Sequence, residues 1–204
     1  MMIYFTSTDL LIELVALVIA LAILWIKKKS SSYLLFFAIF WIYMIGVVSV
    51  VVFPFPIGIP NSNFKPDINL VPFDFGYCHP EMLSLCIRNL YGNILLTIPF
   101  GFGVSFIARI KPKNIFWLAI AVGFTFELVQ LFISFAIRSS FRAVDVNDVI
   151  LNAAGVLLGY AFFRFFAWVY LKSSDHFNIV HKRLFEDIYD VAFQAQASGK
   201  PNNT

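Results

Sequence analysis

The sequence predicts an all-α, polytopic integral membrane protein: a bundle of five transmembrane helices with the N-terminus outside and the C-terminus in the cytoplasm. Hydrophobic residues make up 60% of the 204 residues and charged residues only 13%, whereas a soluble domain carries about 25% charged residues. Five runs are apolar enough to cross a bilayer, and basic residues gather on alternate connections between them. With a net charge of only +3, this composition excludes soluble enzymes, disordered chains and proteins that bind nucleic acid.

The lengths of the apolar runs define the expected spans. A transmembrane helix needs about 20 consecutive, mostly apolar residues. Such runs lie at 9–26, 33–54, 90–108, 114–137 and 148–171. The first run has no basic segment before it and no small-residue cleavage site, so we expect a retained anchor and not a signal peptide. The five-span membrane domain is therefore expected to cover residues 1–171.

The distribution of lysine and arginine predicts the orientation, because basic residues are retained on the cytoplasmic side. The segments after the first, third and fifth runs carry most of them: Lys27, Lys28, Lys29, Arg109, Lys111, Lys113, Lys172, Lys182 and Arg183. The opposite segments hold only Lys65, Arg88, Arg138 and Arg142. We therefore expect the N-terminus, the 55–89 loop and the 138–147 loop outside.

The loop at 55–89 is rich in proline and aromatic residues, which disfavours a regular helix or a central strand. It is either a lid over the outer leaflet or a plain connector. Cys78 and Cys86 both lie in it and can form a disulfide where the compartment is oxidising. With His79 and Glu81 they also suggest a metal site, but the spacing matches no standard zinc motif, so no metal is expected.

Residues 172–204 are expected to form a cytoplasmic amphipathic tail. Apolar residues recur every three or four positions from Phe177 to Val191, as on one face of a helix. This helix lies on the inner membrane surface, on its own bundle or on a second copy of the chain, so a homo-oligomer stays open. The polar end from Ser198 to Thr204 is expected to be disordered.

The fourth run contains the most unusual residue of the chain, an acid within an apolar span. Inside lipid an ionisable side chain costs several kcal/mol unless it is paired or faces water, so Glu127 is a functional candidate. Its depth is about 15 Å at 1.5 Å rise per residue. Gly123, Gln130 and Ser134 share its helical face, which predicts a polar stripe descending from the outer surface.

The fifth run carries a second polar stripe. Asp145, Asp148 and Asn152 are spaced three and four apart, and Gly155 and Gly159 continue the same face. The two glycines permit close approach of another helix. Helix capping by an acid at the positive end of the dipole is the alternative reading of the aspartates.

The third run supplies the remaining wall of a predicted cleft. Asn93 lies near its outer end, and Pro99 with Gly101 predicts a kink near its middle. Three helices then frame a polar cleft open to the outside. Arg142, on the loop above, is the natural counter-ion for Asp145, Asp148 or an anionic ligand.

These residues, in this order, resemble the VanZ-like family of bacterial membrane proteins. The resemblance rests on Asn93-Ile-Leu-Leu-Thr-Ile-Pro99-Phe-Gly101-Phe, on Glu127-Leu-Val-Gln130, on the run from Arg142 to Gly159, and on Asn69-Leu-Val-Pro72-Phe73 in the outer loop. It covers about residues 67–165. By residue the family pattern falls on Asn93, Pro99, Gly101, Glu127, Gln130, Arg142, Asp145, Asp148, Asn152, Gly155 and Gly159.

The resemblance implies a multi-pass protein of the bacterial plasma membrane, in a family associated with resistance to glycopeptide antibiotics, teicoplanin more than vancomycin. The expected partner of the cleft is a membrane lipid, a lipid-linked wall precursor or the lipoglycopeptide drug itself. No cofactor is expected. Because family membership does not determine a ligand, the substrate of this chain stays open.

An integral-membrane enzyme that acts on a phospholipid or lipid-linked headgroup is the alternative. Glu127 and Asp148 are its candidate catalytic residues, as an acid and base pair or as ligands of a divalent cation, with Arg142 holding a phosphate. Against it, Ser134 has no nearby histidine to act as a base. Two further readings are polar residues that only join the helices and an ion-coupled transporter, which five spans without inverted repeats disfavour.

Overall fold

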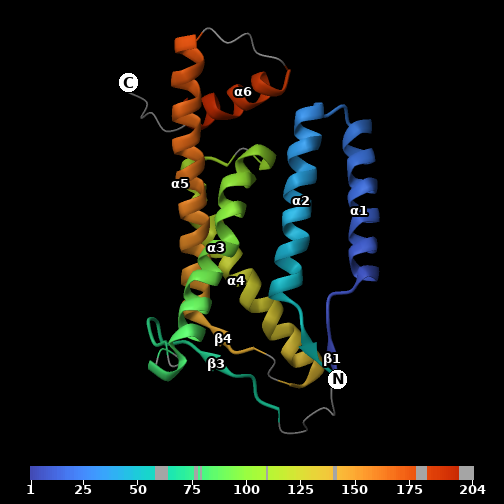
Figure 1. The fold of residues 1–204 in the computed structure, drawn as a ribbon, viewed down its shortest axis with the longest axis vertical. Helices are drawn as coiled ribbons and strands as arrows, with labels where there is room; N and C mark the ends of the chain where they lie inside the picture. Colours follow the sequence, from blue (N-terminus) through green and yellow to red (C-terminus); the bar gives the residue numbers. More distant parts are fainter. Residues whose placement is uncertain are drawn as a thin grey trace.

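The computed structural model describes residues 1–57, 64–75, 78, 80–108, 110–139, 142–177 and 183–197. Within these residues five helices are long and apolar enough to cross a membrane: α1 (Ser7–Ile26), α2 (Ser31–Val51), α3 (Leu83–Ala108), α4 (Pro112–Ile137) and α5 (Val146–Phe177). The predicted all-α, five-span fold is confirmed. The N-terminus and the last helix, α6 (Arg183–Ala197), lie at opposite ends of the bundle (Figure 1). Which end faces the cytoplasm stays a prediction from the basic residues.

Two helices extend at least six residues beyond one end of the apolar runs that predicted them. α3 begins at Leu83, not at residue 90, after a short 3-10 turn at Pro80–Met82, and it continues through Pro99. α5 continues to Phe177, past the predicted boundary at residue 171. The reason is that apolarity marks only the part of a helix that lies in lipid, whereas backbone hydrogen bonding extends it into the polar surroundings. The predicted disordered end, Ser198–Thr204, lies outside the described residues.

Local signals account for the starts of the first helices. Thr6 and Asp9 form a capping box at α1, and the Ser30 hydroxyl accepts the N–H of Tyr33 at the start of α2. Between them the chain reverses at Lys28, whose φ of 56° is left-handed. Glycine is the usual residue at such a helix end, so this tight turn holds a lysine where the backbone favours glycine.

The core of the bundle is the contact of α3 and α4 with α5. Gly101, Gly155 and Gly159 lie where α3 and α5 meet, and a methyl group on Gly159 would overlap the carbonyl oxygen of Ile98. Glycines thus let the two backbones touch. Beside this contact Val156 and Phe163 are fully buried with Ala119 of α4.

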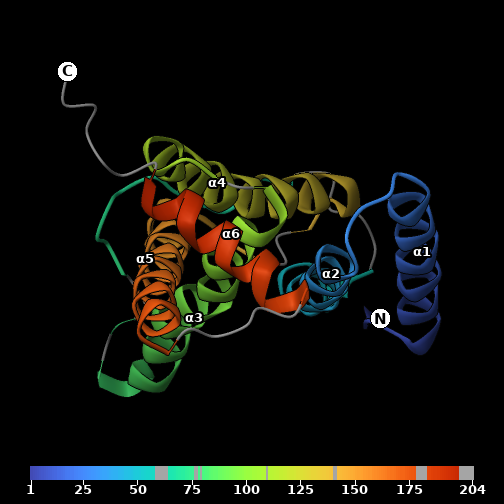
Figure 2. The same cartoon turned by 90° about the horizontal axis from the view of Figure 1, so that it is seen from above.

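α1 stands at the edge of the bundle and packs mainly against α2 (Figure 2). Leu17 is its one buried residue. α6 lies across the end of the bundle that is remote from the N-terminus, in contact with α5, α2 and α3. Arg164 of α5 holds it there by donating to the carbonyl oxygen of Ala195 at 2.6 Å, at the negative end of the α6 dipole.

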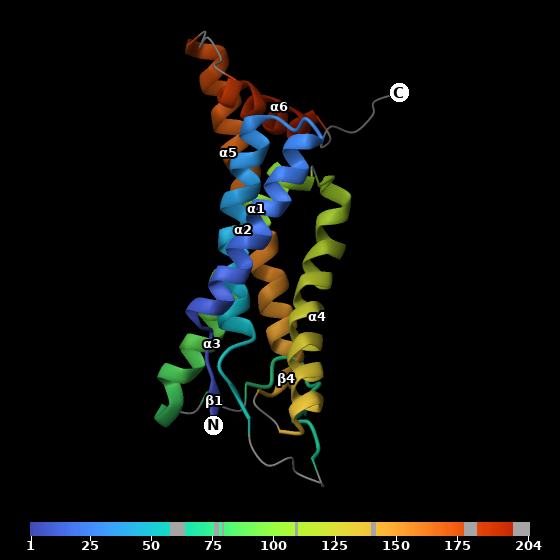
Figure 3. The ribbon, with the colours of Figure 1, turned by 90° about the vertical axis from the view of Figure 1, so that its right-hand side faces the viewer.

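Two pairs of very short strands tie the loops to the opposite end of the bundle. β1 (Met2–Ile3) pairs antiparallel with β2 (Phe55–Pro56). β3 (Ile68–Asn69) pairs in parallel with β4 (Val144–Asp145), which leads directly into α5. Figure 3 shows β4 at the foot of the bundle beside the end of α4. The long loop is therefore attached to the helix that carries the second polar stripe.

Candidate functional site

The structure brings the seven residues of the predicted cleft to one cavity of about 480 Å³. It lies near the end of the bundle that holds the N-terminus and is walled by α3, α4, α5, the end of α2 and the segment that leads to β4. The seven residues are Asn93, Glu127, Gln130, Arg142, Asp145, Asp148 and Asn152. Arg88 and Asn89 of α3 also line it, although sequence reasoning did not select them. We call this space the polar cavity.

Glu127 lies at the α4 wall of the polar cavity and is only 4% exposed. Its Oε2 accepts the main-chain N–H of Asp145 at 2.9 Å. Gln130 and Ser134 follow it on the same buried face of α4, as helical spacing requires. The carboxyl group therefore has two roles, as an acceptor that holds β4 and as a polar group of the cavity.

Asp145 is occupied by structural hydrogen bonds. One of its carboxylate oxygens accepts the main-chain N–H of Asn147 at 2.8 Å, which caps the start of α5. Both oxygens accept from the Asn69 amide at 3.2 Å. For Asp145 the structure therefore supports the capping interpretation, and its side chain links the long loop to α5.

Asn147 attaches the 64–75 segment to α5 beside the polar cavity, and the sequence analysis did not select it as a site residue. It is 1% exposed, and its amide binds main-chain groups of the 64–75 segment. Its Oδ1 accepts the N–H of Phe73 at 2.5 Å, and its Nδ2 donates to the carbonyl oxygen of Asp74 at 3.0 Å. A side chain that binds the backbone of a distant loop produces no periodic pattern in the sequence. The only indication of this contact was therefore the presence of Asn147 itself.

Asp148 and Asn93 join α5 to α3 inside the polar cavity. The Asn93 amide donates to Oδ1 of Asp148 at 2.6 Å. One turn deeper, the Thr97 hydroxyl donates to the carbonyl oxygen of Asn152 at 2.9 Å. The Asn152 side-chain oxygen is buried and has no hydrogen-bond partner within the described part of the chain. A buried acceptor without a partner is unusual in a folded protein, and Asn152 is one of the residues that line the polar cavity.

Arg142 supplies a positive charge to the polar cavity that also contains the carboxylates of Glu127 and Asp148. Its Nη2 donates to the carbonyl oxygen of Val50 at the end of α2, at 2.7 Å. Burial lowers the pKa of the guanidinium, and the charges of Asp148 and Glu127 act in the opposite direction. Because an arginine stays protonated in proteins, the polar cavity holds a cation beside acids, as the sequence suggested.

The side chains around the polar cavity are suited to binding a polar group. Its described lining contains amides, guanidinium groups and carboxylates but no serine, threonine, cysteine, histidine or lysine. Across the residues that the structure describes, no three His, Cys, Asp or Glu side chains are grouped to hold a metal ion. Amides and guanidinium groups bind phosphates, sugars and carboxylates by directed hydrogen bonds.

The two cysteines form a disulfide near the start of α3, with their Cα atoms 5.0 Å apart. Of the two readings left open by the sequence, the structure thus shows the disulfide. His79, which belonged to the metal reading, lies outside the described residues.

A comparison with models of protein families shows to which family the chain belongs. The model described as VanZ/LLP1 matches residues 40–167, more than half of the sequence. The chain belongs to the VanZ/LLP1 family. The match confirms the resemblance seen in residues 67–165 and extends it into α2, so it contains every predicted residue of the polar cavity. No curated protein matches this VanZ-family chain, and no solved structure does.

Proposed function

We propose that this VanZ-family membrane protein lowers susceptibility to glycopeptide antibiotics, teicoplanin more than vancomycin, by holding the polar head of an amphiphile in the polar cavity. The observation that carries the proposal is the gathering of seven polar side chains from three helices and a loop around one space within an apolar bundle. Buried polar residues of membrane helices face each other or a functional cavity. The proposed setting is the outer half of a bacterial plasma membrane.

Three ligands share the chemistry that the polar cavity would recognise: a lipid-linked wall precursor, a phospholipid and a lipid-tailed glycopeptide. Each joins a polar head to an apolar tail. A volume of about 480 Å³ lies within the usual range for small ligands, about 300–1,000 Å³. A phosphate-sugar or glycerophosphate head fits such a space, whereas a whole glycopeptide is too large. The size therefore favours a precursor or lipid head over the intact drug.

Drug susceptibility of a sensitive bacterial host tests the proposal. The host expresses wild-type protein, Glu127→Gln, Asp148→Asn or the control Glu13→Gln at matched membrane levels. Glu13 lies on α1, outside the polar cavity. We expect wild type and the control to raise the inhibitory concentration of teicoplanin more than that of vancomycin, and the two cavity variants to lose the effect. Equal inhibitory concentrations with and without wild-type protein would contradict the proposal.

An enzyme that acts on a lipid or lipid-linked headgroup is the second candidate, because two acids, Glu127 and Asp148, line the same space. Such a pair can transfer protons during cleavage of a headgroup. Mass spectrometry of membrane lipids from the same host distinguishes the two candidates. A product that accumulates with wild type but not with Glu127→Gln supports an enzyme, and an unchanged lipid profile supports binding alone.

A further inference from the structure

We propose that the end of the bundle opposite the polar cavity binds an anionic glycerophospholipid. Its phosphate would lie against Lys28 and Lys29, and one acyl chain would lie in an apolar groove between α2 and α3. This site shares no lining residue with the polar cavity. The inference therefore does not depend on the proposed function.

The headgroup pocket lies at the turn between α1 and α2. It has a volume of about 480 Å³, and its polar lining comes from Lys28, Lys29, Ser30, Tyr33 and Asp187. The Lys29 ammonium lies 5.0 Å from the centre of the Tyr33 ring, which orients it along α2. Lys28 occupies the left-handed turn position described above. Two ammonium groups beside a hydroxyl provide the donors that a phosphate needs.

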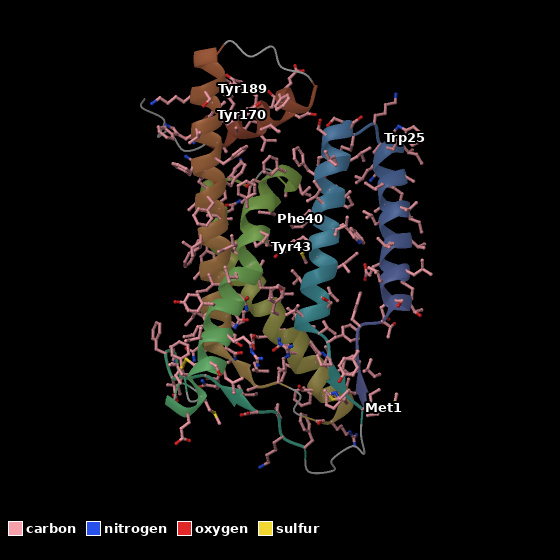
Figure 4. All side chains as sticks on the ribbon, viewed as in Figure 1. Met1, Trp25, Phe40, Tyr43, Tyr170 and Tyr189 are labelled. Atoms are coloured by element: carbon pink, nitrogen blue, oxygen red, sulfur yellow. A yellow bond between two sulfur atoms is a disulfide. The ribbon has the colours of Figure 1, made fainter. Side chains whose placement is uncertain are left out.

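The acyl groove runs along α2 from this pocket. It has a volume of about 530 Å³ and is lined almost entirely by apolar side chains of α2 and α3, together with Phe166 of α5 and Ile188 of α6. Gly103 keeps it open on the α3 side, since a Cβ there would lie 3.0 Å from the Phe40 ring. Figure 4 shows Phe40 and Tyr43 on the side of α2 that faces α3 and α5. Such an apolar groove suits a hydrocarbon chain.

The pocket and the groove form one continuous site. Phe36 and Phe106 line both of them, and their ring centres are 4.6 Å apart. The ten residues from Tyr33 to Tyr43 rise about 15 Å, which is half of the roughly 30 Å hydrocarbon core of a bilayer. The site therefore has the depth of one leaflet.

The groove ends before it reaches the polar cavity. The Tyr43 hydroxyl donates to the carbonyl oxygen of Leu96 at 2.6 Å, which joins α2 to α3 at that level. Leu96 lines the polar cavity on its other side. The bond therefore separates the two sites, and the lipid that we propose enters from the end that carries α6.

Charge favours an anionic lipid over a zwitterionic one. The pocket itself contains two lysines and one acid, a net positive charge, and basic pockets between spans bind anionic headgroups. Asp187 of α6 also lines the pocket and would repel a phosphate. The phosphate is thus expected on the Lys28–Lys29 side, and removal of the Asp187 charge is expected to strengthen binding.

Native mass spectrometry of the purified full-length protein in detergent tests the proposal. Phosphatidylglycerol and phosphatidylcholine with the same acyl chains are titrated in parallel. We expect phosphatidylglycerol to bind about tenfold more tightly, because its net negative charge is attracted by Lys28 and Lys29. Lys28→Gln/Lys29→Gln should remove this preference and Asp187→Asn should increase it. The control Lys27→Gln/Lys113→Gln, which removes the same charge outside the pocket, should keep it.

Titrations with lipids of different acyl-chain length test the apolar groove. Dihexanoyl phosphatidylglycerol, which carries the same headgroup on short chains, should bind at least about tenfold more weakly than the long-chain lipid, because it buries much less apolar surface in the groove. Ile39→Trp, which fills the groove, should weaken the long-chain lipid and leave the short-chain lipid unchanged. Equal affinity for the two headgroups, equal loss in the control, or no effect of chain length would each overturn the proposal. Circular dichroism confirms that every variant keeps its helix content.

Discussion

The main-chain N–H of Asp145 donates to Oε2 of Glu127 at 2.9 Å. This bond joins the middle of the fourth span to the residue that precedes the fifth. It gives the most unusual acid of the sequence a structural partner as well as a place in the polar cavity. Because an amide oxygen can accept the same bond but carries no charge, substitution can separate the two roles of Glu127.

We expect Glu127→Gln to fold like wild type and Glu127→Leu to be destabilised. The glutamine keeps an acceptor for the Asp145 N–H, whereas leucine leaves that buried donor without a partner, at a cost of about 1–3 kcal/mol. Thermal unfolding in detergent measures the difference. If both variants unfold at the wild-type temperature, the hydrogen bond does not contribute to stability.

We expect Asn147→Ala to release the 64–75 segment from α5. The substitution removes the acceptor of the Phe73 N–H and the donor to Asp74, so limited proteolysis should cleave this segment several times faster. Asn89→Ala is the control, because it removes an asparagine of α3 that lines the polar cavity and for which the structure records no hydrogen bond to residues 64–75. Equal cleavage of the two variants would show that Asn147 does not hold the loop.

We expect Gly159→Ala to destabilise the protein by roughly 1–3 kcal/mol through overpacking. A methyl group there would overlap the backbone of Ile98 in α3, so the two helices must move apart. Gly46→Ala is the control, since nothing lies within 4 Å of its added carbon and alanine favours a helix by about 0.5–1 kcal/mol. The unfolding temperature should therefore fall for Gly159→Ala only.

We expect loss of the Cys78–Cys86 disulfide to destabilise the start of α3. The bond closes a short loop, with a sequence separation of 8, and such a crosslink contributes about 2–3 kcal/mol. The double variant Cys78→Ser/Cys86→Ser should unfold at a lower temperature than oxidised wild type and at about the same temperature as reduced wild type. A maleimide reagent that labels unreduced wild-type protein would show that the bond does not form in the cell.

The same cysteines test the orientation of the chain. Disulfides persist in oxidising compartments and are rare in the cytosol. A blocked thiol pair in protein isolated from intact cells therefore supports the outward placement of the 55–89 loop that the basic residues predict. Free thiols in both positions would instead favour the inverted orientation.

Periodicity in the sequence predicted more of this site than it did of its surroundings. Helical spacing correctly grouped Glu127 with Gln130, and Asp148 with Asn152, because positions three and four apart share a face in any helix. Spacing within one helix carries no information on which faces meet, so the Asn93–Asp148 bond required the fold. Long-range bonds from side chains to loop backbone, such as those of Asn147, have no sequence period at all.

The helix boundaries show the same limit of prediction from the sequence. The apolar runs located all five spans, since burial in lipid demands apolar side chains along the whole crossing. They did not locate the start of α3 or the extension of α5 to Phe177, where lipid no longer selects the side chains. Nor did they predict that Arg164 would bind the end of α6, because that contact depends on where the tail folds back.

The bond between Glu127 and Asp145 has a consequence for how the protein is made. The chain is synthesised from its N-terminus, so α4 emerges before the segment that contains Asp145 exists. Until the next 18 residues follow, Glu127 has no main-chain donor from β4 and would be solvated poorly in lipid. α4 and α5 are therefore expected to enter the membrane together, as a helical hairpin that carries its own polar partner.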